Sequence, residues 1–224
     1  MIGIIDYKAG NIRSVKNALS YCGAKFELVS DPEKLLKCDK VLLPGVGAFG
    51  EAMAKLKNAN LDEAIKEFVA SGRYFLGICL GMQLLFDKSE EFGANDGLGL
   101  VSGKVVKFDE SKFQKHRPII LIRHGKPVVL DCDYNKNLKI PHMGWNTLEF
   151  TKQTPLNAGL ESSVYAYFVH SYHAVCDDEF ALAKTTYGYE FVSAVCKDNV
   201  FGFQPHPEKS HDKGIQIIKN FTEL

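Results

Sequence analysis

Short apolar runs alternate with stretches of helical spacing in the first half of the chain. The apolar runs, which predict buried β-strands, span residues 2–5, 26–29, 41–43 and 74–78. Hydrophobic residues recur every three or four positions over residues 11–21 and 61–71, which predicts amphipathic helices, and a further helix is expected over residues 80–86. Asp31 followed by Pro32 is typical of another helix start. Strands alternating with helices indicate a parallel sheet covered on both faces.

The second half of the chain predicts antiparallel strands. After a glycine-rich turn region at residues 93–103, β-branched and aromatic runs are separated by turn residues. These runs span residues 104–108, 119–122, 128–130, 147–150, 164–169, 181–186, 191–196 and 200–203. Residues 209–224 predict a terminal helix, and residues 109–139 predict a polar surface excursion. Because no linker separates the halves, we expect one α/β domain, residues 1–224, with a mixed sheet.

The balance of charges argues against two classes of partner. The 224 residues contain 27 Lys and Arg and 27 Asp and Glu, so the formal net charge is zero. Nucleic acids and anionic membranes attract basic surfaces, so we expect neither as a partner. The first residues lack the pattern of a secretory signal, and the nearly apolar stretch 74–86 is shorter than the roughly 20 residues that cross a bilayer. We therefore expect a cytoplasmic protein.

The six cysteines show neither a C-x-x-C pair nor the spacing of a zinc site. We expect most of them to be reduced and buried, and we expect no metal and no cofactor. Cys79 stands apart because it lies in Gly77-Ile78-Cys79-Leu80-Gly81, at the change from an apolar strand to a helix.

That context is typical of the nucleophile elbow, here with Cys in place of Ser. Flanking glycines permit a sharp turn, and a helix N-terminus favours the thiolate. The N–H of Leu80 would then point at a developing oxyanion. The alternative interpretation, a buried cysteine in a tight turn, is less favoured by the strand–turn–helix context.

A base for this thiol is predicted in Gln204-Pro205-His206-Pro207-Glu208. A thiol nucleophile needs a base, and the base needs a group that orients it. In extended backbone His206 and Glu208 point the same way, so the carboxylate could hold the imidazole. The alternative is an exposed histidine in a proline turn.

A glycine-rich segment, Pro44-Gly45-Val46-Gly47-Ala48-Phe49-Gly50, follows another strand. Its backbone N–H groups could bind an anion or oxyanion, although a simple turn is equally compatible with the pattern. It is not a Walker loop, because no Gly-Lys-Ser/Thr follows. All these loops follow carboxyl ends of strands, the edge that carries the site in open α/β sheets.

With Cys79 in an elbow and His206 and Glu208 near the carboxyl end, the sequence resembles the triad-type class I glutamine amidotransferases. Within them it is more similar to the glutaminase subunits of imidazole glycerol phosphate synthase, in histidine biosynthesis. The matching blocks are residues 4–7, 10–11, 43–49, 77–83, 141–146, 167–172 and 206–210. They follow the family order over essentially the whole chain. The resemblance implies a flavodoxin-like fold with a mixed, mostly parallel sheet flanked by helices and an antiparallel β extension.

The resemblance also implies residue roles. Cys79 would attack the side-chain amide of L-glutamine to give a thioester and ammonia, with His206 as base and Glu208 orienting it. Backbone N–H groups of Leu80 and Val46 would stabilise the oxyanion, the latter from a loop that moves. The amino-acid end of glutamine would be held by a further group of residues: Gly47, Gln83, His170, Ser171 and Tyr172.

The partner implied by the resemblance is a (β/α)₈ cyclase that receives the ammonia and forms a heterodimer with this chain. Asn11, Trp145, Tyr167 and Lys209 would lie at the interface or transmit its signal. A lone subunit would then have low activity until the partner docks.

Two features depart from the family pattern. Pro205 stands where an aromatic residue usually precedes the catalytic histidine, and residues 109–139 are longer than the family leads us to expect. The longer segment leaves open a paralogous glutaminase that supplies ammonia to a sugar amidotransferase for surface glycans. A stand-alone γ-glutamyl hydrolase is disfavoured because the block at 141–146 would have no role in it. A catalytically silent subunit is disfavoured because all three triad positions are intact.

Overall fold

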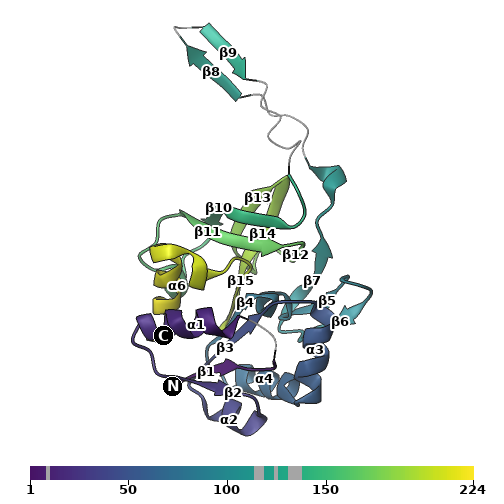
Figure 1. Ribbon diagram of the computed structural model, residues 1–224, viewed down its shortest axis with the longest axis vertical. Helices are drawn as coiled ribbons and strands as arrows, with labels where there is room; N and C mark the ends of the chain where they lie inside the picture. Colours follow the sequence, from purple (N-terminus) through teal and green to yellow (C-terminus); the bar gives the residue numbers. More distant parts are fainter. Residues whose placement is uncertain (9–10, 114–118, 124–125, 131–137) are drawn as a thin grey trace.

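A computed structural model describes residues 1–8, 11–113, 119–123, 126–130 and 138–224, and Figure 1 shows its elements. The elements of the first half are β1 (Ile2–Ile5), α1 (Ile12–Tyr21), β2 (Phe26–Val29), α2 (Pro32–Lys37), β3 (Lys40–Gly45), α3 (Phe49–Asn58), α4 (Leu61–Ala70), β4 (Phe75–Cys79) and α5 (Leu80–Gln83). The strands of the second half are β5 (Phe86–Ser89), β6 (Asn95–Asp96), β7 (Val101–Lys107), β8 (Ile119–Arg123), β9 (Lys126–Leu130), β10 (His142–Phe150), β11 (Ser163–His170), β12 (Tyr172–Val175), β13 (Ala181–Tyr187), β14 (Tyr189–Lys197) and β15 (Val200–Phe203). Three short 3₁₀ helices, η1 (Glu110–Lys112), η2 (Pro155–Asn157) and η3 (Pro207–Lys209), and the helix α6 (His211–Glu223) complete the described chain.

Five parallel strands form the first part of the main sheet, in the order β2-β1-β3-β4-β15. This is the strand order of flavodoxin-like sheets, so the expected parallel α/β arrangement is confirmed. Asp31 caps α2 by accepting a hydrogen bond from the Lys34 N–H at 3.0 Å, and Pro32 occupies the first turn. The helix start expected from the sequence is therefore present.

Two layers of helices cover this parallel sheet. Helices α2, α3 and α4 bury side chains such as Leu35, Met53 and Phe68 against one face. Helices α1 and α6 bury Leu19 and Phe221 against the other. Because helices cover both faces of the sheet, side chains on both faces of the central strands β1, β3 and β4 are buried. These strands are therefore continuous apolar runs, with no alternation of apolar and polar residues.

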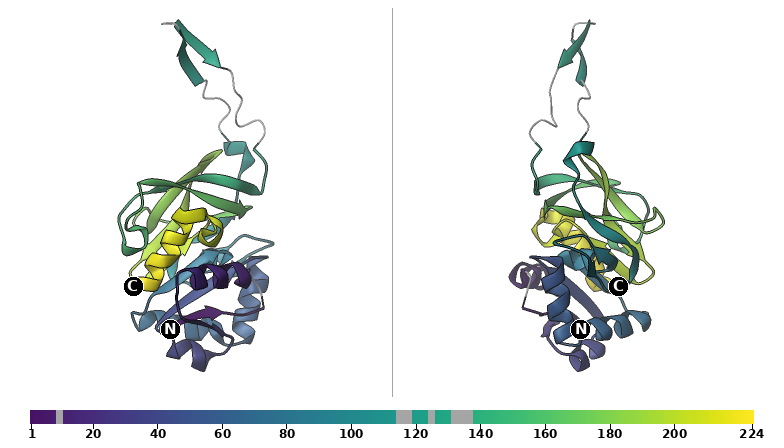
Figure 2. Two further views of the ribbon diagram at one scale, coloured as in Figure 1. Left: turned by 60° about the vertical axis from the view of Figure 1, so that its left-hand side comes forward. Right: turned by 90° about the vertical axis from the view of Figure 1, so that its right-hand side faces the viewer.

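The sheet continues through antiparallel strands. β15 pairs antiparallel with β14, and the path runs on through β12, β7, β5 and β6, while β10, β11 and β13 branch from it. Thirteen of the described strands form this one sheet. Figure 2 shows the antiparallel part and α6 above the parallel strands and α2–α4. The two parts join at β15, which pairs parallel with β4 on one side and antiparallel with β14 on the other.

The helix expected over residues 80–86 is shorter than the apolar pattern predicts. α5 ends at Gln83, and β5 begins at Phe86 and pairs with β7. Every residue from Leu80 to Phe86 is buried, and a continuous apolar run does not distinguish a buried helix from a buried strand. Helix α3, whose first turn overlaps the glycine-rich segment, and strand β12 were not expected from the sequence.

The segment 109–139 contains η1 and the hairpin of β8 and β9, which pair antiparallel in a sheet of their own. Figure 1 shows this hairpin apart from the main sheet. The remainder of the expected surface excursion falls largely on residues 114–118, 124–125 and 131–137, which lie outside the described part of the chain. Within the described residues, no helix combines the length and hydrophobicity needed to cross a bilayer.

We predict that Phe221→Ala lowers the free energy of unfolding by about 3–5 kcal/mol, because the ring is fully buried between α6 and the sheet. Tyr21→Ala is the control, because the Tyr21 side chain is 80% exposed and its loss should change stability by less than about 0.5 kcal/mol. Urea unfolding measures both values. An equal loss of unfolding free energy in the two variants would contradict the burial of Phe221 between α6 and the sheet.

Candidate active site

Cys79 lies on a strained backbone turn at the end of β4. Its φ is 55° and its ψ is −112°, a conformation that L-residues rarely adopt, and α5 begins at the next residue. Backbone strain of this kind is characteristic of functional positions that the surrounding structure holds in place. The elbow expected from the sequence is therefore present.

Close backbone contacts explain both glycines of the Gly-x-Cys-x-Gly pattern. A Cβ on Gly77 would lie 2.5 Å from the carbonyl oxygen of Gly81. A Cβ on Gly81 would lie inside van der Waals contact of the Leu43 carbonyl oxygen, on the neighbouring strand. Any side chain at either position would push α5 away from the sheet and displace Cys79.

His206 and Glu208 form a buried pair next to this turn. His206 Nδ1 lies 2.8 Å from Glu208 Oε1, and both side chains are at most 3% exposed. The backbone is not extended as expected, because Pro207–Lys209 form the 3₁₀ helix η3. This tight turn brings the carboxylate back to the imidazole. The backbone N–H of His206 donates to the Tyr167 carbonyl at 2.8 Å, which fixes His206 to β11, and the pair forms with Pro205 as the preceding residue.

The environment of His206 favours its charged form. Burial lowers the pKa of His206, but interactions with Cys79 and Glu208 outweigh it and raise the pKa to about 10. The other ring nitrogen, Nε2, is buried and has no hydrogen-bond partner among the described residues. An imidazolium beside a thiol stabilises the thiolate, the form that acts as nucleophile.

A cavity of about 690 Å³ opens onto Cys79 and His206. It is also lined by all seven residues that the sequence analysis assigned to substrate or oxyanion binding: Val46, Gly47, Leu80, Gln83, His170, Ser171 and Tyr172. Leu80 is the first residue of α5, so the helix leaves its backbone N–H unpaired.

The glycine-rich segment after β3 lies directly against the elbow. A Cβ on Gly45 would approach the Gly81 nitrogen to 2.7 Å, and Gly47 has a φ of 102°. Val46, between them, is 43% exposed at the cavity. The buried Tyr7 hydroxyl donates to the Pro44 carbonyl at 3.0 Å and so fixes the start of this loop.

A family model described as glutamine amidotransferase class-I matches residues 3–224. The chain belongs to the class I glutamine amidotransferase family. A protein of Sulfurimonas denitrificans named imidazole glycerol phosphate synthase subunit HisH is 53% identical over 224 residues, covering 100% of this chain and 98% of that protein. A protein of the same name from Methanocaldococcus jannaschii is 45% identical over 224 residues, and the alignment covers 100% of this chain and 100% of that protein.

Solved structures agree on the fold of this amidotransferase. The structure described as PurLQS from Thermotoga maritima superposes with a TM-score of 0.71 at 19% identity, covering 99% of this chain and 97% of that one. At this identity the similarity establishes the fold alone, and the fold class expected from the sequence is confirmed.

Three of the four residues expected at a partner interface form one group on the surface of the amidotransferase. Trp145 is 47% exposed and stacks on His211, with ring centroids 4.7 Å apart. Lys209 Nζ lies 5.9 Å from the centre of the Tyr167 ring. Asn11 directly precedes α1, and its side chain caps that helix by accepting a hydrogen bond from the Ser14 N–H at 3.3 Å.

Glu91 and Gln204 are among the site side chains that were not expected from the sequence. Glu91 lines the cavity and accepts a hydrogen bond from the Phe49 N–H at 2.7 Å, at the start of α3. Gln204 is fully buried beside Cys79. Gln204 adjoins the His-Pro-Glu pattern and could have been found there, whereas the role of Glu91 depends on a contact between distant segments.

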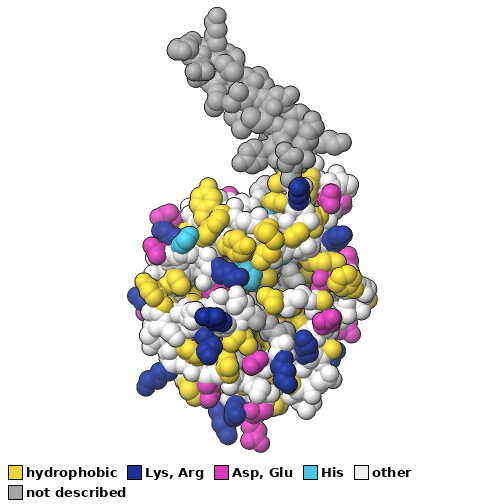
Figure 3. Space-filling model, in the orientation of Figure 1, with side chains coloured by type: hydrophobic (Ala, Val, Ile, Leu, Met, Phe, Trp, Pro, Cys, Tyr) yellow, Lys and Arg dark blue, Asp and Glu magenta, His cyan; other side chains and the backbone are white. Residues whose placement is uncertain are grey.

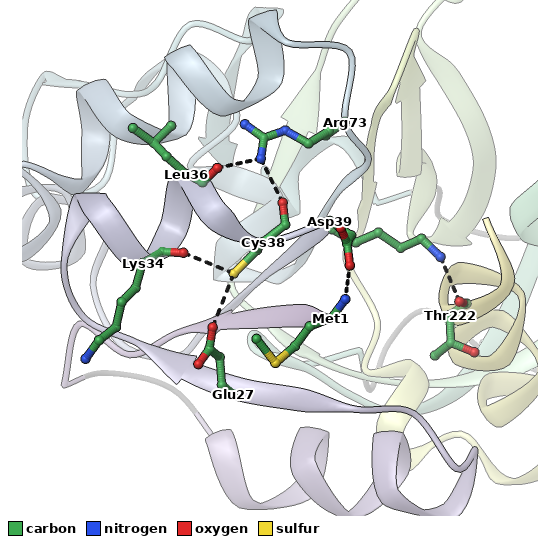
Figure 4. A network of polar contacts seen from close by, with 9 residues as sticks. Met1, Glu27, Lys34, Leu36, Cys38, Asp39, Arg73 and Thr222 are labelled. Atoms are coloured by element: carbon green, nitrogen blue, oxygen red, sulfur yellow. Dashed lines mark hydrogen bonds and ion pairs between the residues drawn. The ribbon is translucent and has the colours of Figure 1, made fainter.

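The other described cysteines occupy different environments. Cys38 donates to the Lys34 carbonyl at 3.3 Å and faces Glu27, within a polar network that also joins Arg73 to the backbone (Figure 4). Burial and the Glu27 carboxylate raise the pKa of Cys38 to about 11. Burial likewise raises the pKa of three further thiols: Cys22, Cys176 and Cys196. Cys132 lies outside the described residues.

No group of three or more His, Cys, Asp or Glu side chains in the described part of the chain is arranged to hold a metal ion. Lys and Arg are interspersed with Asp and Glu on the face drawn in Figure 3, in keeping with the net charge of zero.

We predict that His206 stays protonated up to about pH 10. Because this folded-state pKa lies above the unfolded value of about 6.5, its stabilising contribution is complete below pH 6.5 and is lost as the pH rises through 10. Histidine NMR over a pH series measures the titration. Cys79→Ser and Glu208→Gln should each lower the His206 pKa by about one unit or more, since each removes a favourable interaction. A neutral His206 at pH 8 in the unmodified protein would contradict this.

Proposed function

We propose that this chain is the glutaminase subunit of an imidazole glycerol phosphate synthase. It hydrolyses L-glutamine to glutamate and ammonia and passes the ammonia to a (β/α)₈ cyclase that makes imidazole glycerol phosphate and AICAR in histidine biosynthesis. The observation that carries the proposal is the position of Cys79, on a strained elbow, beside the buried pair of His206 and Glu208. As a biosynthetic subunit, the chain would act in the cytoplasm as a single domain of residues 1–224.

The first step forms a thioester. The Cys79 thiolate attacks the carboxamide carbon of glutamine, and the carbonyl oxygen becomes an oxyanion. Backbone N–H groups of Leu80 and Val46 are the proposed donors to this oxyanion. The His206 imidazolium then gives its Nε2 proton to the leaving amine, the C–N bond breaks, and ammonia departs.

The second step hydrolyses the thioester. His206, now neutral, takes a proton from water, and the hydroxide attacks the thioester carbon. The C–S bond breaks, glutamate leaves, and Cys79 returns as a thiolate beside the imidazolium. Glu208 takes no part in the proton transfers and holds the ring so that Nε2 faces the reacting atoms.

Glutamine is a zwitterion, and the cavity carries both signs of charge. Its lining includes Glu91 and Lys107, residues of opposite charge, as well as the proposed binding residues. Gly47, Gln83 and the backbone of His170, Ser171 and Tyr172 would hold the amino-acid end of the substrate. No strongly charged surface is needed for such a ligand, which accords with a net charge of zero.

The cyclase would dock on the exposed aromatic group around Trp145. Aromatic side chains that are half exposed at a functional edge are typical anchors of protein interfaces. Relatives named as subunits of imidazole glycerol phosphate synthase support the proposed partner, and their alignments run through residues 109–139. That segment therefore does not favour a sugar amidotransferase as acceptor.

We predict that Cys79→Ala abolishes glutamine hydrolysis, because no other described thiol lines the cavity. Glu208→Gln should lower turnover on the order of 10²–10⁴-fold without loss of the fold, because the carboxylate orients His206 and does not react. Glutamate release measured with the cyclase and its nucleotide substrate present is the assay. Retained hydrolysis in Cys79→Ala would overturn the mechanism.

The same assay tests the partner. Turnover should rise when the cyclase encoded in the same genome is added with its nucleotide. If a sugar amidotransferase gives the stimulation instead, or if the lone chain is fully active, the histidine assignment fails.

We predict that Trp145→Ala weakens binding to the cyclase roughly tenfold or more, because exposed aromatic anchors carry much of the affinity of an interface. Tyr21→Ala is the matched control, since Tyr21 is also an exposed aromatic residue but lies at the far end of α1. Calorimetric titration of each variant with the cyclase measures the difference. Equal affinities would remove Trp145 from the interface.

A further inference from the structure

Gln204 contacts the reacting sulfur but has no role in the mechanism above. Its side-chain Nε2 donates to Cys79 Sγ across 3.8 Å, and the residue is fully buried. It follows β15, the strand that adds to β4, so the sheet itself places it beside Cys79. Buried amide groups form hydrogen bonds with specific partners, and one partner of the Gln204 amide is the proposed nucleophile, Cys79.

The direction of this hydrogen bond is fixed by a backbone carbonyl. Gln83 Nε2 lies 3.0 Å from the Tyr172 carbonyl oxygen, which can only accept, so the Gln83 amide nitrogen must face it. Gln83 Nε2 also donates to the Gln204 side chain across 2.9 Å. The Gln204 atom that accepts this hydrogen bond must be Oε1, because the amide nitrogen cannot accept. Gln204 is thereby oriented with its N–H toward the sulfur.

The Tyr172 carbonyl is itself held by a second chain of donors. His170 Nδ1 donates to it at 2.8 Å, so His170 Nε2 must accept from His142 Nδ1 at 3.0 Å. His142 Nε2 then accepts from Asn146 Nδ2 at 3.2 Å, and that nitrogen also donates to the Thr186 carbonyl. Each imidazole carries a single proton in this arrangement. Burial lowers the pKa of His142 to about 4 and that of His170 well below its usual value, so both rings are neutral as the chain requires.

We propose that Gln204 is a further catalytic residue, which donates an N–H to the Cys79 thiolate and is oriented for this by Gln83 and the Tyr172 carbonyl. The inference rests on the proposed glutaminase function for its biological meaning. The hydrogen bond favours the thiolate before attack and again when the C–S bond of the thioester breaks and sulfur leaves with the electron pair. Because both Gln83 N–H groups are used in this chain, its Oε1 alone remains to accept from a substrate donor.

The test measures alkylation of Cys79 by iodoacetamide over a pH series, with the Cys79 peptide quantified by mass spectrometry. Gln204→Met removes the donor and keeps the length of the side chain. We expect its alkylation rate at pH 7 to fall about tenfold and the midpoint of the pH profile to rise by about one unit, the effect of losing a hydrogen bond to a charged atom.

Gln83→Met keeps Gln204 but removes its orienting donor. The Gln204 amide can then turn either way, so we expect a shift in the same direction but smaller. If Gln204→Met does not fold, the alkylation profile of Gln83→Met tests the role of Gln204. Asn220→Leu is the matched control, because Asn220 is also a buried amide with two hydrogen bonds to carbonyls, those of Leu156 and Ala158, but it lies on α6. It should lower the melting temperature and leave the Cys79 profile unchanged.

An unchanged profile in folded Gln204→Met, or a shift of equal size in Asn220→Leu, overturns the proposal. Alkylation by iodoacetamide requires neither glutamine nor the cyclase. The role of Gln204 and the glutaminase function are therefore tested independently of each other. Absent glutamine hydrolysis with a shifted profile would reject the glutaminase function and keep the role of Gln204. Active hydrolysis with an unshifted profile would reject Gln204 and keep the function.

Discussion

The close approach of Gly81 to the Leu43 carbonyl is the constraint on which the site depends. It sets α5 directly against the ends of β3 and β4, and no side chain fits between them. The chain can turn this sharply only if Cys79 accepts a positive φ, a strain that the buried neighbours on both strands hold in place. Cys79, the proposed nucleophile, is therefore positioned by backbone packing.

The second requirement is that His206, the proposed base, reaches the elbow from a distant part of the chain. β15 lies parallel to β4 on one side and antiparallel to β14 on the other, so it joins the two parts of the sheet. Phe203 pairs with Ile78, the residue before Cys79, and the chain then continues through Gln204 to His206. The sheet thus places His206 and Glu208 beside the elbow, and β11 fixes His206 through the Tyr167 carbonyl.

Local patterns predicted the parts of the site that local geometry determines. The glycines around Cys79 and the short spacing of His206 and Glu208 were visible in the sequence because each reflects a turn within a few residues. The reason given for the second was wrong, since η3 and not extended backbone brings Glu208 to the imidazole. Glu91 and Gln204 were missed because their roles depend on contacts with Phe49 and Cys79, which no local pattern encodes. α3 was missed because glycines obscured its start.

Burial alone does not set the charge of a histidine in this protein. His142, His170 and His173 are buried, and desolvation lowers the pKa of each, so they act as neutral groups with one donor and one acceptor. His206 is equally buried, yet its pKa is raised, because Cys79 and Glu208 supply partners for its charged form. A directional chain needs neutral rings, whereas proton transfer to a leaving amine needs a charged one. Cys79 and Glu208, the two acidic neighbours of His206, therefore distinguish its charge state from that of the three neutral histidines.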